Sequence, residues 1–269
     1  MAIGYACLNI GTPNTNIRSV MQRNATAEKL TEVITHNLEA LEKMVDYNIA
    51  NGIRLYRISS DLIPFGSSPV NMLDWPETHK EVFDRIGTKI RRGSMRVSFH
   101  PGQYTVLNSP IEDVVARAIE DLIYHDKILT ALGTDATNKI VLHVGGIYGD
   151  KEAALDRFAE NFQRLPESVQ NRLIIENDDR LYNSEEVLEL TNRLQIPSVF
   201  DNLHHAINPP PSGGDDRYWI AAAAKTWKAR DGKQKIHYSQ QAPGKRPGAH
   251  TDTIQLDTFQ QLYNQLDDP

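Results

Sequence analysis

The chain has 269 residues, a hydrophobic fraction of 40% and a formal net charge of −6, which allow one α/β barrel or two smaller folded domains. This acidic balance argues against a protein that coats nucleic acid through its overall charge, although a local site could reverse the sign. The single cysteine, Cys7, excludes an internal disulfide, and without an apolar run of about 18 residues or a basic-then-apolar leader we expect a cytoplasmic protein.

Short β-rich segments alternate with longer helical patterns along most of the chain, which is typical of parallel βαβ units. The stretch 26–52 has Leu30, Val33 and Leu38 at helical spacing and ends at Gly52, and similar patterns follow at 113–133, 151–165 and 183–195. The expected strands are 3–9, 55–59, 95–100, 139–143, 173–176, 198–201 and 234–239.

This order of elements predicts an α/β fold of the TIM type, a (β/α) barrel. Seven strands are one fewer than the eight of a complete barrel, and the stretch 256–269 has the pattern of a helix that would precede an eighth. Either the strand count is wrong or the barrel is short by one strand at its C-terminal end. Because no low-complexity linker divides the chain, we expect residues 1–269 to form a single domain.

A polar residue ends the inward face of nearly every expected strand. In a barrel, alternate residues point inward and active sites lie at the C-terminal strand ends. A core would not repeat polar residues there, because each buried polar group needs a partner. These residues are His100, His143, Glu176, Asp201 and His237.

Two further histidines extend this set. His204 follows Asp201 by three residues, and His250 follows the loop "APGKRPGA". Any one histidine alone is more often a hydrogen-bonded core residue, but together these side chains indicate Zn²⁺ or Mn²⁺, with Glu176 able to bridge two ions. So many ligands exceed the need of one four-coordinate ion, so two or three divalent ions are expected.

The stretch "MRVSFHPGQYTVL", 95–107, turns at a proline and a glycine after His100 and then presents Gln103 and Tyr104. Alone, such a pair is an ordinary exposed loop. Its place directly after a strand that ends in an expected metal ligand favours contact with a substrate.

Three inward cations have open roles. Lys235 shares a strand face with His237, where Coulomb repulsion disfavours an ammonium beside metal ions. We therefore hypothesise that Lys235 is deprotonated, paired with a carboxylate, or carbamylated into a ligand. Arg57 and Arg96 would either assist the site or pair with carboxylates in the barrel floor.

Eight stretches, taken in order, resemble the UV damage endonuclease family. They are "GYACLN", "LYRISSDLIPFGS", "SFHPGQYTVLNSP", "VLHVGGIYGDK", "IIENDD", "VFDNLHH", "KTW" and "KIHYSQ". The resemblance implies a TIM barrel related to endonuclease IV. It also implies an enzyme that nicks damaged double-stranded DNA immediately 5′ to UV photoproducts and some abasic sites, using a cluster of divalent ions, often manganese. Zn²⁺ or another ion is the alternative, and no protein partner is expected.

The resemblance also implies roles for individual residues. Gln103 and Tyr104 match the pair that probes the duplex at the lesion, Tyr5 and Asn9 match site residues on the first strand, and Glu176 is expected to be catalytic, as is Lys235 from its place beside the metal site. The matching metal-site positions are His100, His143, Glu176, Asp201, His204, His237 and His250.

Two features depart from the family pattern. The family has a histidine within "PFGSSP", where the counterpart here is Ser68, whose hydroxyl can bind phosphate but is a poor metal ligand. The last strand of the family, which carries a glutamate ligand in a Glu-x-Lys stretch, is absent from this sequence.

Two other functions are compatible with the residues. A metal-dependent sugar isomerase or epimerase also groups His, Glu and Asp at barrel strand ends, but it needs an enclosed sugar pocket. A non-catalytic damaged-DNA binder would show structure-selective binding without cleavage.

Overall fold

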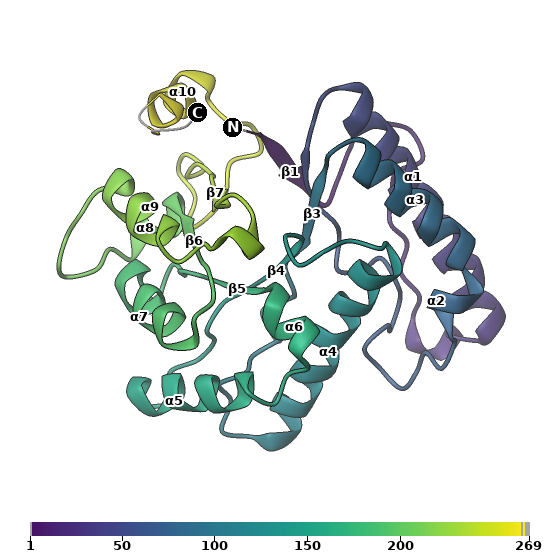
Figure 1. The fold of residues 1–269 in the computed structure, drawn as a ribbon, viewed down its shortest axis with the longest axis horizontal. Helices are drawn as coiled ribbons and strands as arrows, with labels where there is room; N and C mark the ends of the chain where they lie inside the picture. Colours follow the sequence, from purple (N-terminus) through teal and green to yellow (C-terminus); the bar gives the residue numbers. More distant parts are fainter. Residues whose placement is uncertain (1, 265, 267–269) are drawn as a thin grey trace.

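The computed structural model describes residues 2–264 and residue 266, and within them seven strands form one parallel sheet (Figure 1). Each strand pairs with the next in chain order, from β1 to β7. The strands are β1 Gly4–Ala6, β2 Leu55–Arg57, β3 Arg96–Phe99, β4 Lys139–Leu142, β5 Leu173–Glu176, β6 Ser198–Asp201 and β7 Ile236–His237. No pairing joins β1 to β7 among the described residues, so the fold is a TIM-type barrel that lacks one strand, as the sequence predicts.

The helices lie outside the curved sheet (Figure 1). Their ends follow local signals: the Thr26 side chain accepts a hydrogen bond from the backbone of Lys29 at the start of α1, and Gly52 adopts a positive φ after its end. The helices are α1 Ala27–Ala50, α2 Trp75–Thr78, α3 Lys80–Arg92, α4 Glu112–Ala131, α5 Lys151–Phe162, α6 Glu167–Arg172, α7 Ser184–Leu194, α8 Asn202–Ile207, α9 Asp216–Ala224 and α10 Leu256–Tyr263, with 3₁₀ turns η1 Gln22–Asn24 and η2 Ala229–Asp231. None of them is long and apolar enough to cross a bilayer.

The strands β5 and β6 have the predicted bounds, whereas β1 and β7 are much shorter than predicted. Cys7 has a φ of 60°, which takes the backbone out of the extended conformation and ends β1 after Ala6. The predicted placement of Asn9 on the first strand is therefore wrong, and of the two site residues expected there only Tyr5 lies on β1. His100 and His143 lie one residue beyond β3 and β4.

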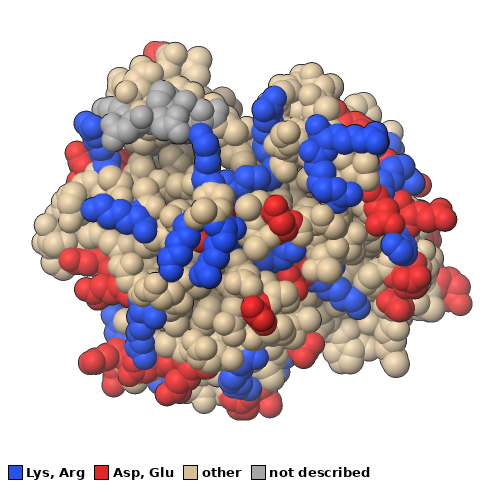
Figure 2. Space-filling view, in the orientation of Figure 1, with Lys and Arg blue, Asp and Glu red and all other residues tan. Residues whose placement is uncertain are grey.

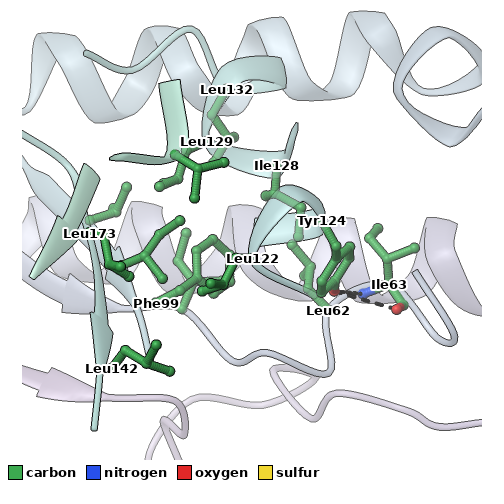
Figure 3. Close-up of a cluster of buried hydrophobic side chains, with 14 of the residues drawn as sticks. Leu62, Ile63, Phe99, Leu122, Tyr124, Ile128, Leu129, Leu132, Leu142 and Leu173 are labelled. Atoms are coloured by element: carbon green, nitrogen blue, oxygen red, sulfur yellow. Dashed lines mark hydrogen bonds between the residues drawn. The ribbon is translucent and has the colours of Figure 1, made fainter. Parts of the chain in front are cut away.

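The main core lies between the outer face of the sheet and the helices. Figure 3 shows Phe99 of β3, Leu142 of β4 and Leu173 of β5 facing Leu122 and Leu129 of α4. All are at most 2% exposed. Inside the barrel a second, small cluster joins three strands to Trp227, and it consists of Val141, Ile174 and Val199. The apolar packing on both faces of the central strands fixes their ends, where the polar residues lie.

The barrel is open at the seam between β1 and β7. A cavity of about 500 Å³ lies there, lined by inward side chains of the first three strands and β7 and closed on the outside partly by Phe259 and Leu262 of α10. The surface seen in Figure 2 carries Lys and Arg interspersed with Asp and Glu, with some basic side chains gathered near its middle. Charge on this face therefore does not form one continuous basic surface.

A buried ion pair closes the floor of the barrel. Lys139 Nζ lies 2.6 Å from Asp231 Oδ1 and donates to the backbone oxygen of Asn171 at 2.8 Å. The Lys139 side chain is 1% exposed and the Asp231 side chain 4%. An ammonium this deeply buried depends on its carboxylate partner.

We expect Asp231→Ala to lower the free energy of unfolding by about 3–5 kcal/mol, because it leaves the Lys139 ammonium unpaired. Asp156→Ala is the matched control, since Asp156 pairs with Arg193 on the surface, both side chains are about half exposed, and its loss should cost less than about 1 kcal/mol. Urea unfolding followed by circular dichroism measures both, and equal effects of the two substitutions would contradict the expectation.

Candidate metal centre and DNA-contacting turn

Glu176, the last residue of β5, is the centre of the polar cluster. Its side chain is 2% exposed, and its Oε1 lies 2.6 Å from His237 Nδ1. Its Oε2 lies 2.8 Å from His100 Nε2 and 3.8 Å from His143 Nε2. Burial alone would raise the pKa of Glu176, but the His237 imidazole and the hydrogen bonds from His100 and His237 hold that pKa well below its usual value. The buried carboxylate is therefore ionised at neutral pH.

Three histidines are oriented by backbone carbonyl groups. The Nδ1 atoms of His100, His143 and His204 lie 3.2, 3.2 and 2.9 Å from the carbonyl oxygens of Pro101, Glu176 and Asn177. A carbonyl oxygen only accepts, so each Nδ1 carries a hydrogen, which leaves Nε2 of His143 and His204 available for a cation. Nε2 of His100 is hydrogen-bonded to Glu176, so a cation would have to replace its hydrogen. Metal-binding histidines are commonly oriented in this way.

Asp201, the last residue of β6, lies beside Glu176 in the buried part of the site. Its Oδ1 accepts from the backbone N–H of His204 at 2.9 Å and caps α8. Burial, and then repulsion from the charge of Glu176, raise the pKa of Asp201 to about 7. Two neighbouring carboxylates of this kind are stabilised by a shared cation.

The donor set fits divalent ions. Ligand atoms lie within 4.8 Å of one another in two groups that share Glu176. One contains His100 and His143, and the other contains Asp201 and His237. Imidazole nitrogen and carboxylate oxygen are donors that Mn²⁺ and Zn²⁺ accept.

The other predicted ligands border these groups. The ring centroid of His204 is 5.5 Å from that of His143 and 6.3 Å from that of His250. His250 is exposed and lies in a loop that bridges to Gln241. The structure thus brings five of the seven predicted ligands into two shared groups, with His204 beside them and His250 at the outer edge.

The predicted lesion-probing pair occupies the corner of a β-turn. The backbone N–H of Thr105 donates to the carbonyl oxygen of Gly102 at 2.9 Å, so Gln103 and Tyr104 are the two central residues. Both are exposed, and Tyr104 is 74% exposed. The Tyr104 ring packs closely over the backbone of Gly102, where a Cβ would lie 2.7 Å from it.

The remaining predicted site residues differ in their placement. Asn9 lies beyond β1, but its Nδ2 donates to the hydroxyl of Tyr5 at 3.2 Å, and Tyr5 lines the cavity beside His237. Ser68 belongs to neither metal-capable group, and its hydroxyl accepts from the backbone N–H of Val70 at 3.3 Å.

The three cationic side chains predicted to point into the barrel have different partners. Lys235 donates to the hydroxyl of Ser98 at 2.5 Å, and burial, followed by repulsion from Arg57, lowers its pKa to about 7. Its described partner is thus a hydroxyl and not a carboxylate. Arg57 reaches the site, with Nη2 3.1 Å from His237 Nε2, whereas Arg96 bonds to backbone carbonyl oxygens in the floor.

One residue of the site was missed by the sequence reasoning. Asn177 exchanges two hydrogen bonds with the backbone of Asp201, at 2.8 and 3.1 Å, and so ties the ends of β5 and β6 together. Its position directly after Glu176 in "IIENDD" was the available signal.

We expect Asp201→Asn to raise the melting temperature by about 3–5 °C at pH 8 with chelator, since it removes a charge that burial disfavours. Because the pKa is raised, the folded state holds a proton that the unfolded state loses, so stability falls between about pH 4 and pH 7. The gain should therefore shrink at pH 5 and disappear near pH 4. In Mn²⁺ the wild type should have the higher melting temperature, because the variant lacks one anionic ligand. Scanning fluorimetry measures all three conditions, and a variant less stable than the wild type in chelator at pH 8 would contradict the expectation.

Comparisons of the sequence with known proteins identify its family. The sequence model of the family described as UV-endonuclease UvdE matches residues 2–268. The UV DNA damage endonuclease of Clostridium perfringens (strain 13 / Type A) is 40% identical over 271 residues, which cover 99% of this chain and 65% of that protein. The corresponding protein of Bacillus cereus (strain G9842) is 35% identical, with 88% of this chain and 74% of that protein covered.

Solved structures show the same relationship. The crystal structure of SacUVDE matches with a TM-score of 0.95 and 35% identity, covering 100% of this chain and 90% of that chain. An L-ribulose 3-epimerase matches with a TM-score of 0.54 and 17% identity, covering 80% and 69%, which shows the fold alone. Because the family model matches residues 2–268 of its 269 residues, the chain belongs to the UV-endonuclease UvdE family.

Proposed function

We propose that this chain is a metal-dependent DNA repair endonuclease that nicks double-stranded DNA on the 5′ side of UV photoproducts and of some abasic sites. Its relatives are named UV DNA damage endonucleases, and an endonuclease that acts on DNA is a hydrolase. The observation that carries the proposal is the buried, ionised Glu176 among His100, His143 and His237. In this proposal residues 1–269 act as one endonuclease domain.

The proposed cofactor is a cluster of two or three divalent ions, with Mn²⁺ expected and Zn²⁺ as the alternative. Such ions lower the pKa of bound water and neutralise charge on the phosphodiester. Each also adds two positive charges, which would offset locally the net charge of −6. The proposed ligands are His100, His143, Glu176, Asp201, His204, His237 and His250.

The chain's own cations would act on the phosphodiester and on the leaving oxygen. The N–H groups of the Arg57 guanidinium lie near His237 and can donate hydrogen bonds to a phosphate oxygen. Lys235, whose pKa is about 7, holds a proton in only part of the molecules at neutral pH, so it can transfer one to the leaving oxygen. A neutral amine is also the form that carbamylation requires, and extra density beyond Nζ at high resolution would support that form of Lys235.

Gln103 and Tyr104 are proposed to probe the duplex. A phenol ring stacks on any base, and an amide can fill the space left by displaced nucleotides. Damaged duplexes need less energy to unstack, so insertion of this turn would favour many distorting lesions over intact DNA. Tyr5, Asn9 and Ser68 would contact the substrate beside the metal ligands.

The alternative of a sugar epimerase is less well supported. The epimerase structures are under 20% identical to this chain, so the likeness concerns the fold. An exposed Tyr104 suits a large substrate better than an enclosed sugar. The non-catalytic binder remains as an outcome of the first experiment below.

We expect the protein to nick UV-irradiated supercoiled plasmid in Mn²⁺, with little nicking of unirradiated plasmid and none in chelator. Glu176→Gln should reduce the rate at least about a thousandfold, since it removes the charge shared by both ligand groups. Gel electrophoresis measures conversion to the nicked circle. A folded wild type that binds irradiated plasmid without nicking it would favour the non-catalytic binder.

We expect Tyr104→Ala to lower kcat/KM on lesion-containing duplex by about tenfold or more, because stacking of one base contributes about 1–3 kcal/mol. Tyr218→Ala is the matched control, since Tyr218 is a similarly exposed tyrosine on α9. Initial rates on a duplex with one cyclobutane dimer measure the effect, and equal rates for both variants would argue against a probing role.

A further inference from the structure

The turn that carries Gln103 and Tyr104 is fixed at one end. Gln103 and Tyr104 face solvent, but Thr105, the next residue, is only 3% exposed. Its hydroxyl donates to Asp121 Oδ2 at 2.6 Å. The tip of the turn is therefore held by one side-chain hydrogen bond directly at its base.

The same carboxylate holds a second loop. Ser67, in the loop between β2 and α2, donates from its hydroxyl to Asp121 Oδ1 at 3.0 Å. The Asp121 side chain is 15% exposed, and hydrogen bonds to an ionised acceptor are stronger than those between neutral groups. One carboxylate on α4 thus joins the loops that follow β2 and β3.

The helix that carries Asp121 is itself a rigid support. The hydroxyl of Tyr124 donates to the carbonyl oxygen of Ser60 at 2.9 Å and accepts from the backbone N–H of Ile63 at 3.1 Å (Figure 3 labels Tyr124 and Ile63). Gly66 packs so closely on the Tyr124 ring that a Cβ there would lie 2.2 Å from it. Helix α4 therefore holds the β2–α2 loop at several points.

A residue that wedges into DNA must be stiffer than the stack that it opens. Unstacking a base step requires a few kcal/mol, and a turn that bends at lower energy would yield before the duplex does. The hydrogen bond between Thr105 and Asp121 is the side-chain contact that opposes such bending at the base of the turn.

We propose that Asp121 is a positioning residue that locks the Gln103–Tyr104 turn to the β2–α2 loop and thereby gives the enzyme its preference for damaged DNA. This role rests on the proposed function. Asp121 acts through Thr105, and the residues around Glu176 at the strand ends carry out the proposed hydrolysis.

The test combines a measurement without DNA and one with it. Thr105→Val removes the hydroxyl and keeps the shape, and Asp121→Asn leaves one acceptor oxygen for two hydroxyl groups. In both variants, hydrogen exchange of a peptide covering 100–107, followed by mass spectrometry, should become at least about tenfold faster. The ratio of kcat/KM on dimer-containing to undamaged duplex should fall about tenfold, mainly through KM.

Two variants serve as controls. Thr105→Ser keeps a hydroxyl and should restore both readouts to near the wild-type values. Thr191→Val removes a buried threonine hydroxyl whose one partner among the described residues is the carbonyl oxygen of Leu188, so it should leave both readouts unchanged.

Unchanged exchange of the peptide 100–107 in Thr105→Val and Asp121→Asn would overturn the proposal. Faster exchange with an unchanged preference for the dimer would overturn it as well. If the wild type does not nick DNA, the proposed function is wrong, but the role of Asp121 can still be tested. The preference is then measured as binding of the same two duplexes by fluorescence anisotropy, and its loss in both variants would still support the role of Asp121.

Discussion

The repulsion between two buried carboxylates governs the chemistry of this molecule. Glu176 and Asp201 end adjacent strands, and apolar packing on both sides of the sheet prevents these strand ends from separating. The site therefore contains negative charge that a proton on Asp201 or a nearby cation can stabilise. The raised pKa of Asp201, which burial and then this repulsion produce, and the proposed binding of a cation follow from that constraint.

The fold and the strand-end residues were predictable from the sequence, because strand alternation and barrel geometry place His100, Glu176 and Asp201 at one end by local rules. Less was predictable at the sheet margins. The short β1 results from a left-handed backbone at Cys7, which no side-chain pattern announces. The hydrogen bonds of Arg96 in the barrel floor and of Asp121 with the turn join residues that are not neighbours in sequence. The periodicity of hydrophobic residues along the sequence therefore does not reveal them.

The rigid and the exposed parts of the site come from different segments. Strand ends hold the cluster, while the turn around Tyr104 projects from the following loop and is attached through α4. This separation lets the strand-end residues remain fixed while the loops differ among proteins of the same fold.

In the described part of the chain, the seam between β1 and β7 leaves a cavity at the side of the barrel interior. The cavity at the seam reaches Lys235, Arg57 and His237 from the side, away from the strand ends where a duplex would lie. In the proposed function, a duplex over the strand ends would leave this cavity uncovered. The surroundings of Lys235 would then depend on the seam and on α10 rather than on the bound DNA.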